Sequence, residues 1–198
     1  MYKRQYREGA RWAVALYAEG GWEALNRAYA RLPCSTEQIL HPQKYLDGEP
    51  PQPLALPDLG AALGEGWERL RHDTLGEWLL GLHLSAHLED ATTAWEAAAG
   101  WAGDTFEIWE SEEGELLLVW RVAWDDRDEA AEFERAYGLL VPRFRTPPLV
   151  AVDNPYRLPG RLWDGAAGAA YVGRTGRVVT VVWGPDLEMV VEVAEALP

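Results

Sequence analysis

Two histidines in this sequence have the spacing of a helix-borne metal site. His83 and His87 are four residues apart in a stretch with helical periodicity, so both rings would lie on one helix face. A zinc peptidase helix carries His-Glu-x-x-His, in which the Glu is the general base, but Leu84 follows His83 here. Two histidines also leave a zinc site short of ligands. We interpret the pair as partly exposed helix histidines and expect neither a metal nor a cofactor.

Segment 35–45 contains a second group of polar residues. Ser35 and Gln38 have the spacing of a capping box, in which the hydroxyl accepts from an unpaired helix amide and the amide side chain reaches back. Pro42 should stop this short helix near Leu40, because proline disfavours a helical residue before it. The segment is therefore predicted to be a short capped helix followed by a turn.

The turn places His41 and Tyr45 where they can contact the rest of the helical half, and we expect them to dock near Glu77. If Glu77 holds His41, the protonated imidazole is favoured and the pKa of His41 rises. A solvent-reachable pocket beside His41 would indicate a functional role. We favour the structural role, because local backbone chemistry accounts for most of the motif.

Other patterns of catalysis are missing from the sequence. Cys34 is the single cysteine, so no internal disulfide and no cysteine metal cluster can form, and it is best interpreted as a small packed side chain. Gly60 to Gly66 lacks the Lys-Ser/Thr of a phosphate loop, and no Gly-x-Ser-x-Gly elbow is present. The sequence itself therefore favours a chain without enzymatic activity, although it leaves the question open.

The elements that must position these residues are helical in the first half. Stretches 2–18 and 22–32 have helical periodicity, and Gly20-Gly21 separates them, which predicts an antiparallel helical hairpin. A stiff connection with four prolines spans 47–57. Stretch 67–89 is interpreted as mostly helix, and a further helix should follow Asp90.

The second half has a repeated order of elements. Stretch 103–140 is predicted as strand, turn, strand and helix, and 168–197 has the same order after a Pro- and Gly-rich loop. Two such units can build a four-stranded antiparallel sheet with both helices on one face. The predicted fold class is α+β, with a helical half over 1–102 and a strand-strand-helix repeat over 103–198, together one compact unit.

Composition limits the classes of partner. The chain has 198 residues, 32 of them acidic and 18 basic, for a net charge of −14, which argues against binding nucleic acid or an anionic membrane. The N-terminus begins a charged helix rather than a secretory leader, and no stretch approaches a membrane span, so we expect a cytoplasmic protein. Eleven tryptophans indicate that some indole rings lie at interfaces between elements or partners.

Several short stretches resemble one family. They are Tyr6-Arg7-Glu8-Gly9, Gly20-Gly21-Trp22 with Ala28-Tyr29, Ser35 to Pro42 with Lys44-Tyr45, Leu75-Gly76-Glu77, Ala98 to Trp101 with Gly103-Asp104, and Trp124-Asp125 with Glu132-Phe133. They are similar to the C-terminal part of a group of prokaryotic zinc-metallopeptidase-like proteins, over roughly residues 6–140. In longer members a His-Glu-x-x-His helix lies upstream. This sequence has none, so the resemblance transfers no zinc ligand and no catalytic Glu.

The resemblance implies candidate binding positions rather than catalytic ones. They are Glu37, Gln38, His41, Lys44 and Tyr45, and we add Glu77 as the expected neighbour of His41. The leading hypothesis is a non-catalytic accessory domain that binds a protein or peptide. The alternative is part of a split metal-dependent hydrolase whose zinc-bearing half is another chain. A third hypothesis is a small-molecule binder with a Trp-lined cleft between the helical half and the sheet.

Overall fold

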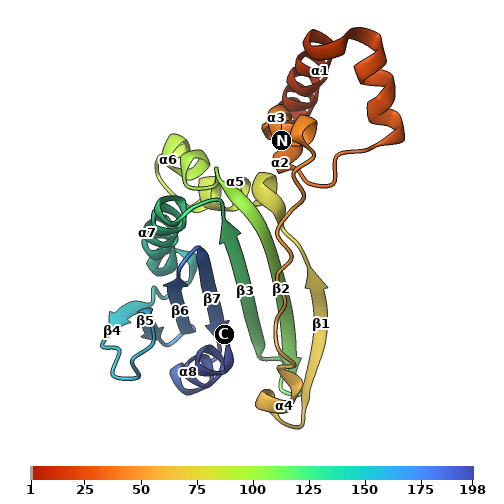
Figure 1. Ribbon diagram of the computed structural model, residues 1–198. Coiled ribbons are helices and arrows are strands. Elements are labelled where there is room, and N and C mark those ends of the chain that lie inside the picture. Colours follow the sequence, from red (N-terminus) through yellow and green to blue (C-terminus); the bar gives the residue numbers. More distant parts are fainter. Residues whose placement is uncertain (1) are drawn as a thin grey trace.

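A seven-stranded antiparallel sheet forms the centre of the chain (Figure 1). The computed structural model describes residues 2–198, with side chains from Tyr6 onward. The strands lie in the order β1-β2-β3-β7-β6-β5-β4, and neighbours are antiparallel. Their bounds are β1 Trp67–Asp73, β2 Trp101–Ser111, β3 Leu116–Trp124, β4 Val150–Val152, β5 Gly160–Gly165, β6 Gly168–Thr175 and β7 Val178–Gly184.

Helices cover both faces of this sheet. Helices α5, α6 and α7 pack on one face, called here the α7 face, and α8, α4 and the extended segment 49–58 cover the other, the α8 face (Figure 1). The helix bounds are α1 Tyr2–Ala30, α2 Glu37–Leu40, α3 Pro42–Asp47, α4 Gly60–Leu63, α5 Gly76–His87, α6 Ala91–Glu96, α7 Arg127–Phe144 and α8 Leu187–Ala196.

Strand β3 shows why both faces are covered. Trp120, Val122 and Trp124 enter the core cluster of the α7 face. Leu117 and Val119, on the alternate positions, enter the cluster of the α8 face. Successive side chains of a strand point to opposite faces, so a strand that is apolar throughout needs a cover on each side. The sequence prediction of a central strand covered on both faces is confirmed.

The predicted four-stranded sheet is wrong, because three further strands join it. Stretch 67–73, interpreted as helix, is strand β1 at the sheet edge beside β2. Its sequence Trp-Glu-Arg-Leu-Arg-His-Asp is mostly exposed, so it lacks the alternation that identifies a half-buried strand. Strands β4 and β5 lie in the stretch interpreted as a loop, where Val150–Val152 is short and wholly exposed.

The predicted placement of α7 and α8 on one face is also wrong. Phe133 of α7 packs on Trp124 with ring centroids 4.8 Å apart, on the α7 face. Val190 of α8 belongs to the opposite cluster with Leu117. The two units have the same order of elements, but β3 and β7 are apolar on both faces, so that order alone does not determine which face receives each helix.

Helix α1 projects from the body as a hairpin of two arms (Figure 1). Its backbone leaves helical geometry at Gly20 and Gly21, and Gly21 has φ 57, a region that glycine adopts without a Cβ clash. The sequence prediction of two helices joined at these glycines is confirmed. The hairpin has its own small cluster of buried side chains, Leu16, Ala28 and Tyr45. Across residues 2–198, no helix has both the length and the apolar character needed to traverse a bilayer.

Candidate functional site

The segment 35–45 folds largely as its sequence predicts. The Ser35 hydroxyl accepts from the Gln38 amide at 3.2 Å, and the Gln38 side-chain oxygen accepts from the Cys34 amide at 2.9 Å. Helix α2 ends before Pro42, but the chain then starts α3 instead of a plain turn. Proline at the first position of α3 suits a helix start, since its missing amide hydrogen would have no partner there.

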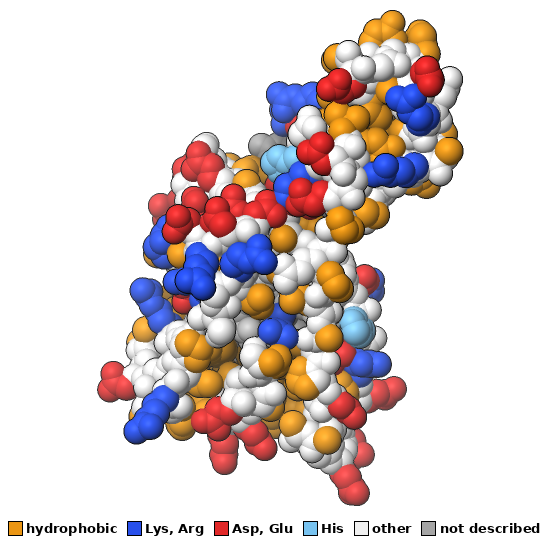
Figure 2. Space-filling model, viewed as in Figure 1, with side chains coloured by type: hydrophobic (Ala, Val, Ile, Leu, Met, Phe, Trp, Pro, Cys, Tyr) orange, Lys and Arg blue, Asp and Glu red, His pale blue; other side chains and the backbone are white. Residues whose placement is uncertain are grey.

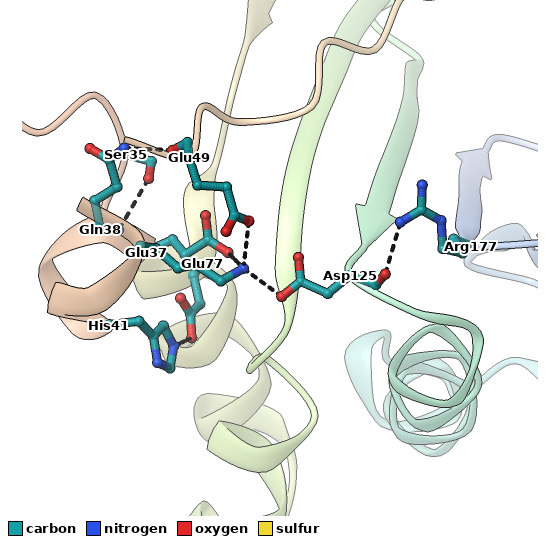
Figure 3. A network of polar contacts seen from close by, with 9 residues as sticks. Ser35, Glu37, Gln38, His41, Glu49, Glu77, Asp125 and Arg177 are labelled. Atoms are coloured by element: carbon teal, nitrogen blue, oxygen red, sulfur yellow. Dashed lines mark hydrogen bonds and ion pairs between the residues drawn. The ribbon is translucent and has the colours of Figure 1, made fainter. Parts of the chain in front are cut away.

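Glu37, Glu49 and Asp125 belong to one polar network (Figure 3), and Lys44 of α3 contacts all three. Its ammonium group lies 2.6 Å from Glu37, 2.5 Å from Asp125 and 3.1 Å from Glu49. Asp125 immediately precedes the cap of α7, and its carbonyl oxygen accepts from Arg177 of the β6–β7 turn at 2.8 Å. The network therefore joins the base of the α1 hairpin to the sheet body.

Sequence analysis identified Glu37 and Lys44 but not their partners across the fold. Glu49 and Arg177 lie in polar turn sequences that resemble any exposed loop. Asp125 is followed by Asp126, which caps α7 by accepting from the next amides of that helix. The one signal for Asp125 was its place among the family-like stretches. Its contact with Lys44 spans 81 positions of sequence.

Burial governs the electrostatics of this network. Glu37 is 2% exposed, and burial raises its pKa to about 7 against the opposing effect of Lys44. The pKa of Lys44 is raised, because the hydrogen bonds to Asp125, Glu37 and Glu49 outweigh the effect of burial. Oxygens of these three carboxylates lie within 4.8 Å of one another, a spacing that a cation could bridge. The Lys44 ammonium group is itself the cation that contacts all three.

His41 and Glu77 form a pair beside this network, as the sequence predicted. The imidazole Nε2 lies 2.8 Å from Glu77 Oε1, and that hydrogen bond is the main reason the pKa of His41 is raised. The Glu77 side chain is 4% exposed, whereas that of His41 is 42% exposed. Among the residues described, Glu77 Oε2 has no hydrogen-bond partner.

A cleft of about 270 Å³ opens beside this pair. It is lined by Arg7 and Glu8 of α1, Leu40, His41, Glu77, Trp78 and Trp95, with Ala99 at its edge. The sequence predicted a structural role for His41, and a solvent-reachable pocket was the feature expected of a functional role. The structure contains both features, a buried carboxylate that holds His41 and a solvent-reachable cleft beside the two.

Tyr45 and Gln38 act away from the cleft. The Tyr45 hydroxyl donates to the Arg31 carbonyl oxygen at 2.6 Å, and its buried ring lies 5.1 Å from the ring of Trp12 in the hairpin. The Gln38 side-chain amide donates to the Glu49 carbonyl oxygen at 2.6 Å. Both residues therefore stabilise the attachment of the hairpin and are not placed to touch a ligand in the cleft.

Asp104 is a buried polar centre that sequence analysis did not single out. Its carboxylate accepts from the amides of Leu75 and Gly76 at the start of α5, and from the indole nitrogens of Trp101 and Trp120, all at 2.8 to 2.9 Å. A cavity of about 470 Å³ adjoins it. Four donors satisfy the carboxylate, so Asp104 serves to hold the start of α5 on the sheet.

The histidine pair of α5 lies among aromatic rings, and the part of the chain whose side chains are described places no third His, Cys, Asp or Glu ligand beside it. His83 and His87 are half-buried, as predicted, with ring centroids 5.3 Å apart. Burial lowers the pKa of His83 to about 4, so its ring is neutral at physiological pH. The rings of Trp120, Tyr137 and Phe144 surround it, at centroid distances of 5.7 to 6.4 Å.

An antiparallel sheet covered by helices on both faces is thus the domain that carries Asp104 and the histidine pair of α5. Residues 65–194 match the family described as domain of unknown function DUF8575, and the chain belongs to that family. The match covers the sheet and α5 to α8, and it leaves the α1 hairpin and segment 35–45 outside. The resemblance to zinc-metallopeptidase-like proteins stays a hypothesis beside this membership.

No curated protein matches the chain. Among solved structures, the extracellular domain of PknH from Mycobacterium tuberculosis is similar at 13% sequence identity and a TM-score of 0.47. The alignment covers 73% of this chain and 95% of that one.

Proposed function

We propose that the chain is a non-catalytic accessory domain that binds a partner protein through the α1 hairpin. One observation carries the proposal: large apolar side chains that would normally be buried are exposed together on a hairpin that projects from the body. Tyr29 is 85% exposed, Tyr6 76% and Trp22 70%, with Leu32, Val14 and Tyr17 also exposed. Contiguous apolar surface of this kind marks protein-binding sites.

The exposed side chains are arranged along the hairpin rather than scattered. Tyr6, Val14 and Tyr17 recur at helical spacing on the first arm, and Trp22 and Tyr29 recur on the second. Tyr17 and Trp22 touch at the tip, with ring centroids 5.4 Å apart. Figure 2 shows hydrophobic side chains gathered over the hairpin. Large aromatic rings with few rotatable bonds make effective anchors in interfaces.

The network described above would hold this surface in place. Lys44 ties the base of the hairpin to Asp125 of the body, and Tyr45 packs on Trp12 inside the hairpin. A binding surface that is rigidly held loses less conformational freedom when a partner binds. The residues that resemble the peptidase-like family would therefore hold the contact surface in place and would not themselves touch the partner.

The charge distribution indicates the chemistry of the partner. Residues 1–32 carry six basic and three acidic side chains, a net charge of +3, whereas residues 33–198 carry 12 basic and 29 acidic, a net charge of −17. The hairpin is thus the basic part of an acidic chain. We infer a partner segment with an apolar face flanked by carboxylates, such as an acidic amphipathic helix.

The split-hydrolase hypothesis uses the same surface with a different partner. In that case a chain bearing a His-Glu-x-x-His helix would occupy the hairpin, and the pair would hydrolyse peptides. Hairpin variants would then remove hydrolysis by the mixture, whereas the accessory-domain proposal requires loss of binding only. A cytoplasmic location goes with either hypothesis and stays a proposal.

The test uses two designed helical peptides with the same leucine face, one flanked by glutamate and the other by lysine. Fluorescence anisotropy should show binding of the acidic peptide, weaker binding of the basic one, and loss of binding in a Trp22→Ser, Tyr29→Ser variant. Leu139→Ser, at a 62% exposed position on α7, is the matched control and should change nothing. Sedimentation velocity is run in parallel. A tight dimer that the hairpin variant dissociates would contradict the proposal, because a second copy would then cover the surface.

A further inference from the structure

A separate cavity of about 240 Å³ lies on the α7 face, away from the hairpin. It is lined by Leu75, His83, Phe106, Ile108, Leu118, Trp120, Tyr137, Phe144 and Trp183. Apolar cavities of about 150 Å³ already accept benzene. This one is larger, so it has room for an aromatic ring or a branched chain with a short extension.

The walls of the cavity favour an uncharged occupant. Aromatic rings form much of the lining, and Phe144 and Trp183 lie 5.1 Å apart between centroids. The indole nitrogen of Trp183 donates to the Tyr137 hydroxyl at 3.2 Å, so its polar atom is already paired. The pKa of His83 falls because burial disfavours its charged form, which shows how poorly this space accommodates an ion.

A cation lies against two of the lining rings. The Arg145 guanidinium lies 5.7 Å from the Phe144 ring centroid and 5.8 Å from that of Trp183, two rings that line the cavity. In the part of the chain that the structure describes, Arg145 has no carboxylate partner. Arg143, two positions earlier, is paired with Glu89 at 3.1 Å. A cation without an ion pair therefore lies beside an apolar cavity in a chain of strong negative charge.

We propose that this cavity binds a small apolar carboxylate, whose hydrophobic body fills the aromatic space and whose anionic group lies against Arg145. The body contributes affinity through burial of apolar surface, and the planar guanidinium matches the geometry of a carboxylate. The site does not involve the α1 hairpin, so it stands independently of the function proposed above. It assigns a ligand class, small apolar carboxylates, to the hypothesis that the chain binds a small molecule in a Trp-lined cleft.

The same chemistry can come from two sources. A free aromatic or branched aliphatic acid has it, and so does the C-terminal residue of a peptide that ends in a large apolar side chain. Two probes distinguish them: 3-phenylpropionate, and the tripeptide Gly-Gly-Phe with a free C-terminus. Because Arg145 is exposed, its contribution should be moderate.

The experiment compares 3-phenylpropionate with its neutral alcohol 3-phenylpropanol and its amine 3-phenylpropylamine, by titration calorimetry and quenching of tryptophan fluorescence in the full chain. We expect the carboxylate to bind about fivefold more tightly than the alcohol, the amine to bind most weakly, and Arg145→Gln to remove the difference. Arg135→Gln, at an exposed arginine of the same helix, is the matched control and should preserve the difference.

A second variant tests the cavity itself. Ile108 is half-buried at its edge, so Ile108→Trp should fill the space without disturbing the core and should abolish binding of all three compounds. Tight binding of Gly-Gly-Phe but not of its C-terminal amide would assign the site to a peptide end. Equal affinity for acid and alcohol, or binding that survives Ile108→Trp, would overturn the proposal. No quenching by any probe would overturn it equally.

Discussion

The α1 hairpin and the sheet body use the same residue types in opposite ways. In the body, Trp101, Trp124 and Phe133 are at most 1% exposed and lie within a large core cluster. In the hairpin, Trp22 and Tyr29 are exposed, and the buried cluster contains only Leu16, Ala28 and Tyr45 of the described residues. The body is therefore stabilised by its own core, whereas the hairpin depends on its polar attachment and offers its apolar side chains to another surface.

The difference also separates the two candidate binding regions. The cavity beside Arg145 is formed by strands and helices of the DUF8575 domain, residues 65–194. The hairpin surface lies outside that range, so substitutions in one binding region can leave the other unaffected. The His41 cleft lies at the joint between them, where α1, α2, α5 and α6 meet.

Removal of a core ring should produce the largest loss of stability. Phe133 is fully buried among the rings of Trp120, Trp124 and Tyr137. Phe133→Ala should lower the free energy of unfolding by about 3–5 kcal/mol, as measured by urea denaturation, because the cavity that it leaves cannot collapse fully. Phe133→Leu is the control and should cost less than about 1.5 kcal/mol. A loss below about 1 kcal/mol for the alanine variant would argue against a rigid body core.

Removal of the Lys44 charge tests the attachment of the hairpin. Lys44→Met leaves Glu37, Glu49 and Asp125 without their shared cation. We expect the free energy of unfolding to fall by about 2–3 kcal/mol, less than the roughly 3–5 kcal/mol for a fully buried pair, because Glu37 can take up a proton instead. Hydrogen exchange should accelerate in α2 and α3 but not in β3. Glu37→Gln added to Lys44→Met should recover part of the loss, and equal exchange in both regions would contradict the proposed joint.

The pH dependence of stability should follow Glu37 and His41. Between about pH 4.5 and 7, native Glu37 retains a proton that the unfolded chain has lost, so the free energy of unfolding should fall as pH rises through this window. The pKa of His41 is also raised, so its contribution is full below about pH 6.5 and fades as pH climbs through its folded value. His41 is well exposed, and its share should be below about 1 kcal/mol.

Two variants separate these contributions. Glu37→Gln should flatten the stability curve between pH 4.5 and 7, and His41→Gln should flatten its upper part only. Urea denaturation at half-unit pH steps measures both. If His41→Gln left the curve unchanged at every pH, the hydrogen bond to Glu77 would make no contribution to the free energy of unfolding.

Substitutions on the hairpin surface should barely affect stability. Trp22→Ser and Tyr29→Ser change exposed positions, so the free energy of unfolding should stay within about 0.5 kcal/mol of the parent chain while peptide binding is lost. Thermal unfolding followed by circular dichroism checks the first part, and anisotropy checks the second. A loss above about 2 kcal/mol would mean that these rings stabilise the fold and are not free to bind a partner.

Metal removal should have no effect on either region. Elemental analysis of the purified chain should find no stoichiometric zinc, and EDTA should leave the unfolding midpoint unchanged, because His83 and His87 lie among aromatic rings and the Lys44 ammonium group already contacts the three carboxylates. About one zinc per chain that disappears in His83→Ala would reverse this expectation.

Local chemistry explains which predictions from sequence are confirmed. Gly20 and Gly21 break α1, and the Ser35 hydroxyl accepts from the Gln38 amide in the first turn of α2. Each depends on residues within a few positions of one another. The contact of His41 with Glu77 was also anticipated, because a docked turn needed a polar partner in the helical half.

Pairing between distant segments explains the wrong predictions, which concern strand β1 and the faces covered by α7 and α8. Strand β1 carries mostly charged side chains because it is an edge strand with little buried surface, so its sequence has no strand periodicity. Its identity comes from hydrogen bonding to β2, which no window of sequence reveals. The faces chosen by α7 and α8 were hidden for a related reason, since β3 and β7 are apolar on both sides.

The sequence by itself determined the apolar strands, the helix ends and the acidic charge of this chain, since these follow from side-chain type and short-range backbone geometry. Only the tertiary structure decided that Trp22 is exposed while Trp124 is buried, that Lys44 meets Asp125, and that Arg145 lies beside two rings of an aromatic cavity. Burial and long-range contact depend on how remote segments pack, and residues of the same type lie in a core or on a surface according to what that packing leaves uncovered.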